Sequence, residues 1–493
     1  MEQSKLVQYI SNLERKDQDK FVQFVESPYF NQHRPTLQLL RLILKEINRK
    51  KPRLSKEYVF TKLFPDKPYH EQQLYDVMSN LKKLLHRYLA QQQFESRPLQ
   101  EELHTIQWAY EHNQFDLFTN RGKQLDKQLE RIPYHNENFF YLNYQYRQML
   151  GYYGGEYVDR SKSHQLQEMM DHLDNFYILE KLRNSCHLTA HNILMNTQYN
   201  FSILDQVLQY IEQNPKRFAK EPAIELYYTI LMTLRDDENP DYYQKLKKML
   251  ARRYDVLSPV EQQDLYSFSY NYCIRKINQG QTDYQLELFN LYKQGLRSGI
   301  LLNNGIIGEW NYKNITTLGC SLKEFEWTES FINTYKDHLP AHQRENAYSY
   351  NLANLYYNKQ MYDEAISALL HVQFTDIKYH LNTTYLLLRT YYAKKDIEAL
   401  LSLVETFRVY ILRNKKMTTE QKKGYTNFLR FTKRLVVLQQ SASTYPKKEY
   451  EQKMEKLADK IRETKNVINQ KWLLKEAGHP EEADASPAQS LAG

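Results

Sequence analysis

Three side chains with metal-binding chemistry stand close together in the middle of the chain, at Cys186, His187 and His191. Thiolates and imidazoles are the usual zinc ligands, and residues four positions apart share a helix face, so His187 and His191 would point the same way. His164 or His172 could approach from an earlier turn. Among 15 histidines such pairs arise by chance, and no second ligand pair with a recognised spacing accompanies them. We therefore expect no metal site and no cofactor.

Sequence motifs for catalysis are also missing. The glycine-containing stretch 151–155 follows no predicted strand, so we interpret it as a turn between helices and not as a phosphate-binding loop. The stretch 70–74, which reads His-Glu-Gln-Gln-Leu, lacks the second histidine of a zinc-protease helix. No serine or cysteine has the sequence context of a nucleophile elbow. We predict that the chain is not an enzyme.

Two groups of three residues, each spaced i, i+4, i+7, are the best candidates for a binding surface. They are Tyr350, Asn354, Tyr357, Tyr385, Arg389 and Tyr392, and the second group follows the first by 35 residues. The spacing puts each group on one side of a helix. Amide and guanidinium groups between aromatic rings suit a peptide backbone or a carboxylate, because they offer donors beside apolar surface. The alternative is that these tyrosines only pack between helices, since the chain holds 42 tyrosines.

The elements that must position these residues repeat with the same period. Runs that begin at Trp327, Tyr362 and Ile397 are similar to one another and start 35 residues apart. A repeat of that length is typical of stacked helix pairs, none of which can bury its apolar face alone. Only 13 of the 493 residues are glycine, which disfavours helix interiors. We predict an all-α fold, an α-solenoid of antiparallel helix pairs.

The segment 350–372 resembles a tetratricopeptide repeat. The positions where that family places its packing residues hold Leu352, Ala353, Tyr356, Ala365 and Leu369. The next unit, 385–403, matches less well. The proline that the family places after the second helix is missing at 377. The resemblance implies that the six candidate residues line a concave groove that holds extended peptides.

The first hundred residues are basic. They hold 18 Lys and Arg against 11 Asp and Glu, which accounts for +7 of the chain's net charge of +8. Frequent prolines divide this region into short helices, among them 35–49, 55–63 and 70–92, with Ser55 as an N-cap. The candidate nucleic-acid contacts are Arg49, Lys50, Lys51, Arg53, Lys82, Lys83 and Arg87. The alternative is a solvated charged face.

The segment 54–85 resembles the helix-turn-helix of bacterial transcriptional activators, with the turn at 64–66 and the motif Ser-Asn-Leu-Lys at 79–82. The resemblance implies that the long helix enters the major groove of DNA. The β-hairpin wing of those proteins is missing after residue 90. The stretches 27–31 and 63–65 also resemble an uncharacterised bacterial protein family, which implies no activity.

We expect five parts along the chain. They are a basic helical module at 1–98, irregular helical repeats at 99–302, tetratricopeptide-like repeats at 303–442, a capping helix within 443–478 and a disordered tail at 479–493. Within them we predict single helices over 303–320 and 447–476. The start of the chain lacks a signal-peptide core, no apolar run could span a membrane, and three scattered cysteines suit a reducing cytosol. We expect a cytoplasmic location.

The sequence therefore favours a non-catalytic scaffold or adaptor that binds a partner protein or peptide in a solenoid groove. The alternative is a DNA-associated transcriptional regulator that uses the basic N-terminal module. The identity of the partner is not encoded in any motif that we find.

Overall fold

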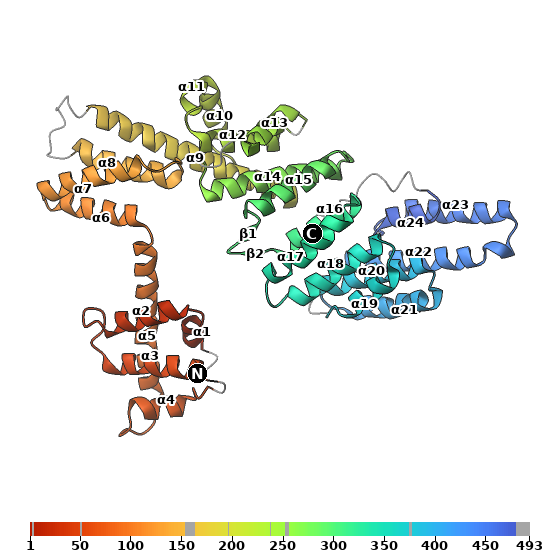
Figure 1. Ribbon diagram of the computed structural model, residues 1–493, viewed down its shortest axis with the longest axis horizontal. Coiled ribbons are helices and arrows are strands. Elements are labelled where there is room, and N and C mark those ends of the chain that lie inside the picture. The colour runs from red at the N-terminus through yellow and green to blue at the C-terminus, as the bar shows by residue number, and fades with distance from the viewer. Residues whose placement is uncertain are drawn as a thin grey trace. The chain divides into compact units, whose positions relative to one another are not determined.

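Figure 1 shows a computed structural model of the 493-residue chain. It describes residues 1, 4–49, 52–152, 163–195, 197–236, 238–251, 256–373 and 377–479. Within these ranges the chain forms helices α1–α24 and the two short strands β1 and β2. The predicted all-α fold of stacked helix pairs is therefore confirmed. None of the helices in these ranges is long and apolar enough to cross a membrane.

The chain divides into two compact units, which we describe separately. The first comprises Met1–Pro133 and Glu137–Phe176, and the second comprises Tyr134–Asn136 and Tyr177–Gly493. The boundary falls inside helix α9 (Ser163–Met195), so this long helix contributes one part to each unit.

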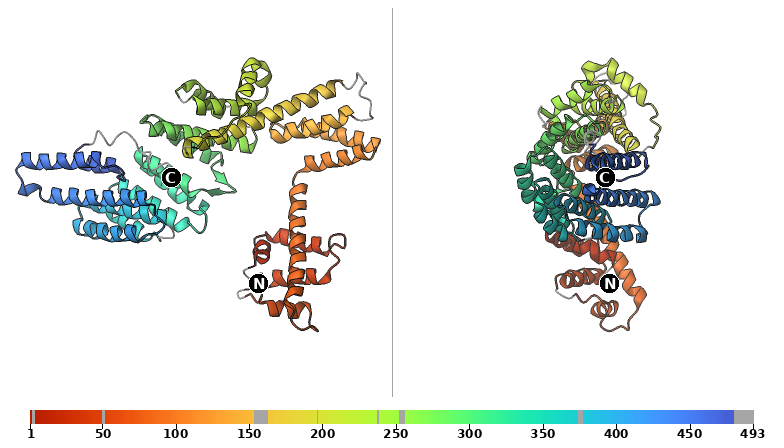
Figure 2. Two further views of the ribbon diagram at one scale, coloured as in Figure 1. Left: turned by 180° about the vertical axis from the view of Figure 1, so that it is seen from behind. Right: turned by 90° about the vertical axis from the view of Figure 1, so that its right-hand side faces the viewer.

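The first five helices form the basic bundle of the first unit. They are α1 (Lys5–Ser11), α2 (Arg15–Glu26), α3 (Arg34–Ile47), α4 (Lys56–Leu63) and α5 (Glu71–Glu95). Helices α2, α3 and α4 pack against α5, which runs through the group in Figure 2. Ser55 Oγ accepts a hydrogen bond from the Tyr58 backbone N–H at 3.2 Å, which confirms the predicted N-cap of α4.

The rest of the first unit consists of α6 (Pro98–Glu111), α7 (Phe115–Leu129), α8 (Glu137–Tyr152) and the start of α9. Only Ser96 and Arg97 separate α5 from α6. Helices α6, α7 and α8 share a core that includes Leu103, Ile106 and Phe118. This core is distinct from that of the basic bundle.

The second unit continues with α10 (Leu204–Gln213), α11 (Pro215–Phe218), α12 (Pro222–Arg235), α13 (Pro240–Ala251), α14 (Pro259–Asn278) and α15 (Tyr284–Arg297). Four of these helices begin with proline, because the missing N–H has no intrahelical partner at that position. Ser258 and Glu261 form a capping box that fixes the start of α14.

A short β-hairpin between α15 and α16 was not predicted. Strand β1 (Leu302–Asn303) pairs antiparallel with β2 (Ile306–Ile307). The connecting residues Asn304 and Gly305 have φ of 50° and 77°, as a type I′ turn requires. The predicted helix over 303–320 is therefore wrong at its start, and α16 runs over Glu309–Ser321.

The following helices stack in sequence: α16, α17 (Phe325–Tyr335), α18 (Arg344–Asn358), α19 (Tyr362–Leu370), α20 (Ile377–Lys394), α21 (Ile397–Arg413) and α22 (Thr419–Gln440). Each packs against the next, and α18 also contacts α16 and α20. Lys323, Gln360 and Lys395 all have positive φ, and each stands two residues before the second helix of a pair. The same turn therefore recurs through the stack.

The C-terminal helix predicted over 447–476 is wrong, because two helices occupy that range. They are α23 (Lys447–Glu463) and α24 (Gln470–Glu476), and α24 packs on α22 with Trp472 buried. Thr464 is extended and ends α23, and Asn466 and Asn469 adopt positive φ in the loop that follows it. Of the tail predicted at 479–493, all but His479 lies outside the described residues.

The loop between α23 and α24 lies unusually close to α22. Asn427 Nδ2 donates to the Asn466 carbonyl oxygen at 3.0 Å, and Asn466 Nδ2 donates to the Glu420 carbonyl oxygen at 2.7 Å. A methyl group added at Gly424 would lie 2.7 Å from Asn466 Oδ1 and 3.1 Å from Ile468 Cγ1. Glycine at 424 therefore permits this approach.

Candidate functional site

Four of the six predicted binding residues line one cavity of about 800 Å³, which we call the Arg389 cavity. Tyr350 and Asn354 reach it from α18, and Tyr385 and Arg389 reach it from α20. Its remaining walls come from α16, α22 and the loop before α24. These walls include Trp310, Lys313, Tyr425 and residues 466–470.

Aromatic rings surround the guanidinium group of Arg389. Its Cζ atom lies 4.8 Å from the ring centre of Tyr357, 5.5 Å from that of Tyr385 and 6.0 Å from that of Trp472. The side chain is half-buried. These rings hold the guanidinium group through cation–π contacts, and the Tyr357 and Tyr385 hydroxyls accept hydrogen bonds from it.

The lining of the Arg389 cavity is cationic. Lys313 and Arg389 both contribute to it, and no Asp or Glu is among the described residues that do. Lys313 Nζ lies 5.5 Å from the ring of Trp310 and 5.7 Å from that of Tyr350. In the described part of the chain no carboxylate forms an ion pair with Arg389. The arrangement favours an anionic ligand.

Neutral tyrosine hydroxyls complete the lining. Burial raises the pKa of Tyr350 and Tyr385, and it raises the pKa of Tyr425 to about 12. All three groups therefore keep their protons at physiological pH and remain hydrogen-bond donors. Together with the Asn354 amide they can bind carboxylate or carbonyl oxygens.

The other two predicted residues do not line the cavity. Tyr357 stacks behind Arg389, as described above. Tyr392 donates a hydrogen bond to Gln439 Oε1 at 3.0 Å, and its ring lies edge-on to Trp472 at 5.1 Å. Tyr392 thus packs between α20, α22 and α24, as the alternative interpretation of the tyrosines describes.

Sequence reasoning missed the contributions of α16 and the loop before α24. Trp310, Lys313 and Thr317 follow the i, i+3, i+7 spacing of one helix face. This spacing could have identified them as residues of one surface. Nothing in the sequence marks residues 466–470 as a wall, because their position depends on the turn that returns α24 to α22.

The three side chains with metal-binding chemistry do not converge. Cys186 is buried and its thiol donates to the Tyr227 carbonyl oxygen at 3.2 Å. His187 Nε2 lies 3.6 Å from Asp264 Oδ2, and His191 Nδ1 lies 3.1 Å from the Tyr199 hydroxyl. Across the described ranges, no three His, Cys, Asp or Glu residues are grouped as a metal ion requires. His164 instead lies beside Glu168, and His172 lies against Phe139 and Phe140.

Five of the seven candidate nucleic-acid contacts are among the described residues, and all five lie on the surface of the basic bundle. Arg49 and Arg53 are exposed around the end of α3, and Lys82, Lys83 and Arg87 are exposed on α5. Lys50 and Lys51 lie outside the described residues.

No protein-family model matches the chain, and no curated protein matches it significantly. The geometry of the Arg389 cavity is therefore the strongest indication of what the chain binds.

Proposed function

We propose that the chain is a non-catalytic adaptor that binds a partner protein through a peptide carrying a carboxylate. The binding site is the Arg389 cavity. One observation carries the proposal: the cavity is lined by two cations, Arg389 and Lys313, and by no acidic residue among those described.

Arg389 is half-buried, and its guanidinium group donates to the neutral Tyr357 and Tyr385 hydroxyls. Neutral acceptors replace part of the hydration that burial removes, and a carboxylate would add the opposite charge. A carboxylate can accept paired hydrogen bonds from a guanidinium group, and the Lys313 ammonium group adds a second positive charge to the lining of the same cavity. Neutral Tyr350 and Tyr385 hydroxyls favour the same oxygens, and the Asn354 amide suits the adjoining peptide bond.

The resemblance of 350–372 to a tetratricopeptide repeat supports the same proposal. It implies a groove for extended peptides on the helices that carry Tyr350 and Arg389. The cavity volume of about 800 Å³ is large enough for several side chains of such a peptide.

The test is an affinity pull-down of the tagged full chain from the cells that make it, with and without nuclease treatment. We expect a stoichiometric protein partner that survives nuclease and is lost from the variant Lys313→Gln/Asn354→Ala. The control variant Lys416→Gln/Asn290→Ala changes exposed residues outside the cavity and should retain the partner. A partner retained equally by both variants would refute the assignment of the cavity.

A second candidate function is nucleic-acid binding by the basic bundle. It is favoured by the exposure of Lys82, Lys83 and Arg87 on one helix. Each phosphate contact lowers the logarithm of affinity by about 0.9 per tenfold increase in salt. Replacing Lys82, Lys83 and Arg87 together with alanine should therefore reduce the salt dependence of the affinity for duplex DNA. The absence of duplex binding by the full chain at low salt would exclude this function.

A further inference from the structure

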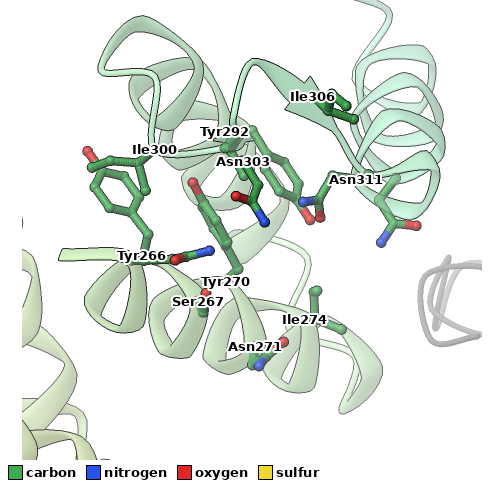
Figure 3. A pocket seen from close by; sticks show the side chains of 14 residues that line it. Tyr266, Ser267, Tyr270, Asn271, Ile274, Tyr292, Ile300, Asn303, Ile306 and Asn311 are labelled. Atoms are coloured by element: carbon green, nitrogen blue, oxygen red, sulfur yellow. The ribbon is translucent and has the colours of Figure 1, made fainter. Parts of the chain in front are cut away.

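A second cavity, of about 370 Å³, lies where α14, α15, the β-hairpin and α16 meet (Figure 3). We call it the Asn271 cavity. Tyr270, Tyr292 and Asn303 stand near the middle of the view, and Asn311 lies on the α16 side. No charged residue is among the described residues that line it. It therefore differs in chemistry from the Arg389 cavity.

The β-hairpin supplies one wall through a single face. Asn303 and Ile306 are directly paired across the two strands, so their side chains leave the same face of the hairpin. Both line the cavity and both are exposed. The type I′ turn at Asn304 and Gly305 fixes this register, because a one-residue slip would turn both side chains away.

Helix α14 supplies the facing wall as a polar stripe. Gln263, Ser267 and Asn271 follow one another at intervals of four residues and are all exposed. The side-chain amides of Asn271, Asn303 and Asn311 form no hydrogen bond with any other described residue. Each amide can therefore offer both a donor and an acceptor to a ligand.

The stripe has the dimensions of a short extended chain. Eight residues of helix rise about 12 Å, which equals about three to four residues of an extended peptide at 3.3 Å each. Peptide groups present hydrogen-bond donors and acceptors in alternation, and the side-chain amides along the cavity can pair with both. Ile274 and Ile306 add apolar surface for a side chain. An uncharged extended segment fits this lining, whereas a charged segment would lose hydration without gaining a counter-ion.

Helix α16 connects the two cavities. Its residues Asn311 and Asn314 line the Asn271 cavity, and Trp310, Lys313 and Thr317 line the Arg389 cavity. At 100° per residue these five positions occupy one continuous side of the helix. The two cavities therefore lie beside the same side of α16.

We propose that the Asn271 cavity binds an uncharged stretch of the same extended peptide whose carboxylate occupies the Arg389 cavity. The partner's recognition motif then has two parts, an acidic group and a separate stretch of uncharged residues. This inference rests on the adaptor function proposed above and specifies its ligand.

The test uses a phage-displayed library of random 16-residue peptides with free carboxyl termini, selected on the full chain. Selected sequences are synthesised with a fluorescent label and their affinities are measured by anisotropy. We expect sequences that combine an acidic group with an uncharged stretch. The variant Asn271→Ala/Asn311→Ala should weaken them about tenfold or more, since two hydrogen-bonding amides are lost. The exposed control Asn290→Ala should leave affinity unchanged.

Two other results would each overturn the inference, and they are distinguishable. If the selected peptides share only an acidic group and bind wild type and the Asn271→Ala/Asn311→Ala variant equally, the Asn271 cavity is not a subsite and the adaptor function stands. If no peptide is selected by the wild-type chain, both proposals fail together.

Discussion

Cations occur in two contrasting settings in this protein, the Arg389 cavity and the surface of the basic bundle. In the cavity Arg389 is half-buried among aromatic rings, and no described carboxylate pairs with it. In the bundle Arg41 pairs with Glu26, and Arg49 pairs with Glu46 at 2.8 Å. Lys82 and Lys83 are exposed there.

The two settings differ in whether a negatively charged ligand is expected to bind the cation. Water or a neighbouring carboxylate already stabilises the cations of the bundle, so their number alone indicates little. Arg389 is instead held by neutral partners, the aromatic rings and the Tyr357 and Tyr385 hydroxyls, so an incoming carboxylate can supply the negative charge that these partners lack. The setting of a charge is therefore more informative than the +7 net charge that distinguishes the first hundred residues.

The largest effect should come from the aromatic support of Arg389. Replacing Trp472 with alanine removes a buried ring that contacts Arg389, Tyr392 and Phe428. We expect the free energy of unfolding of this region to fall by about 3 kcal/mol or more. Hydrogen exchange of the α20 and α24 amides measures the change. Trp472→Phe keeps an aromatic ring, so it should lower this free energy far less. An equal loss in both variants would show that an aromatic ring at this position does not supply the support.

An intermediate effect distinguishes the paired cation from the unpaired one. Arg49→Met removes the ion-pair partner of Glu46, whose side chain is fully buried. The loss should lower the free energy of unfolding of the basic bundle by about 1–3 kcal/mol. Arg389→Met keeps most of the packing, and the Tyr357 and Tyr385 hydroxyls that Arg389 donates to stay neutral, so it should change the stability of its region by less than about 1 kcal/mol.

Urea unfolding followed by hydrogen exchange measures both Met variants in their own regions. A larger loss for Arg389→Met than for Arg49→Met would reverse the comparison. It would mean that Arg389 is primarily a structural residue.

The smallest effect belongs to the exposed lysines of α5. Lys82→Ala and Lys83→Ala should each change stability by less than about 0.5 kcal/mol, because water solvates both side chains in the folded and unfolded chain. Thermal unfolding followed by circular dichroism checks this expectation. A loss above 1 kcal/mol in either variant would show that the bundle surface holds an interaction beyond solvation.

The helices were predictable from the sequence where local chemistry determines them. Ser55 caps α4 as expected, because a serine hydroxyl and a nearby backbone N–H suffice for that interaction. The 35-residue period likewise predicted the stack, since each helix pair must bury its apolar face against the next.

The errors occurred at turns that depend on single residues. The predicted helix over 303–320 overlooked the Asn304-Gly305 pair, and the helix over 447–476 overlooked Asn466 and Asn469. Asparagine tolerates positive φ but also occurs within helices, so its presence alone does not end a helix.

The i, i+4, i+7 spacing showed which residues share one face of a helix. It could not show which of them line a cavity. Tyr392 shares the spacing of Tyr385 and Arg389, but the return of α24 covers it with Trp472. Lys313 belongs to the cavity although it lies outside both groups, because α16 packs beside α18. Which helices become neighbours is a property of the whole stack and not of any one helix.

The close approach at Gly424 links a residue outside the Arg389 cavity to the wall of that cavity. Residue 424 touches the loop that walls the Arg389 cavity and is not itself among the residues that line it. A single added carbon there would require Asn466 or Ile468 to shift, and both of these residues line the cavity. A substitution at this one position would therefore alter the cavity wall while every ligand-contacting side chain keeps its identity.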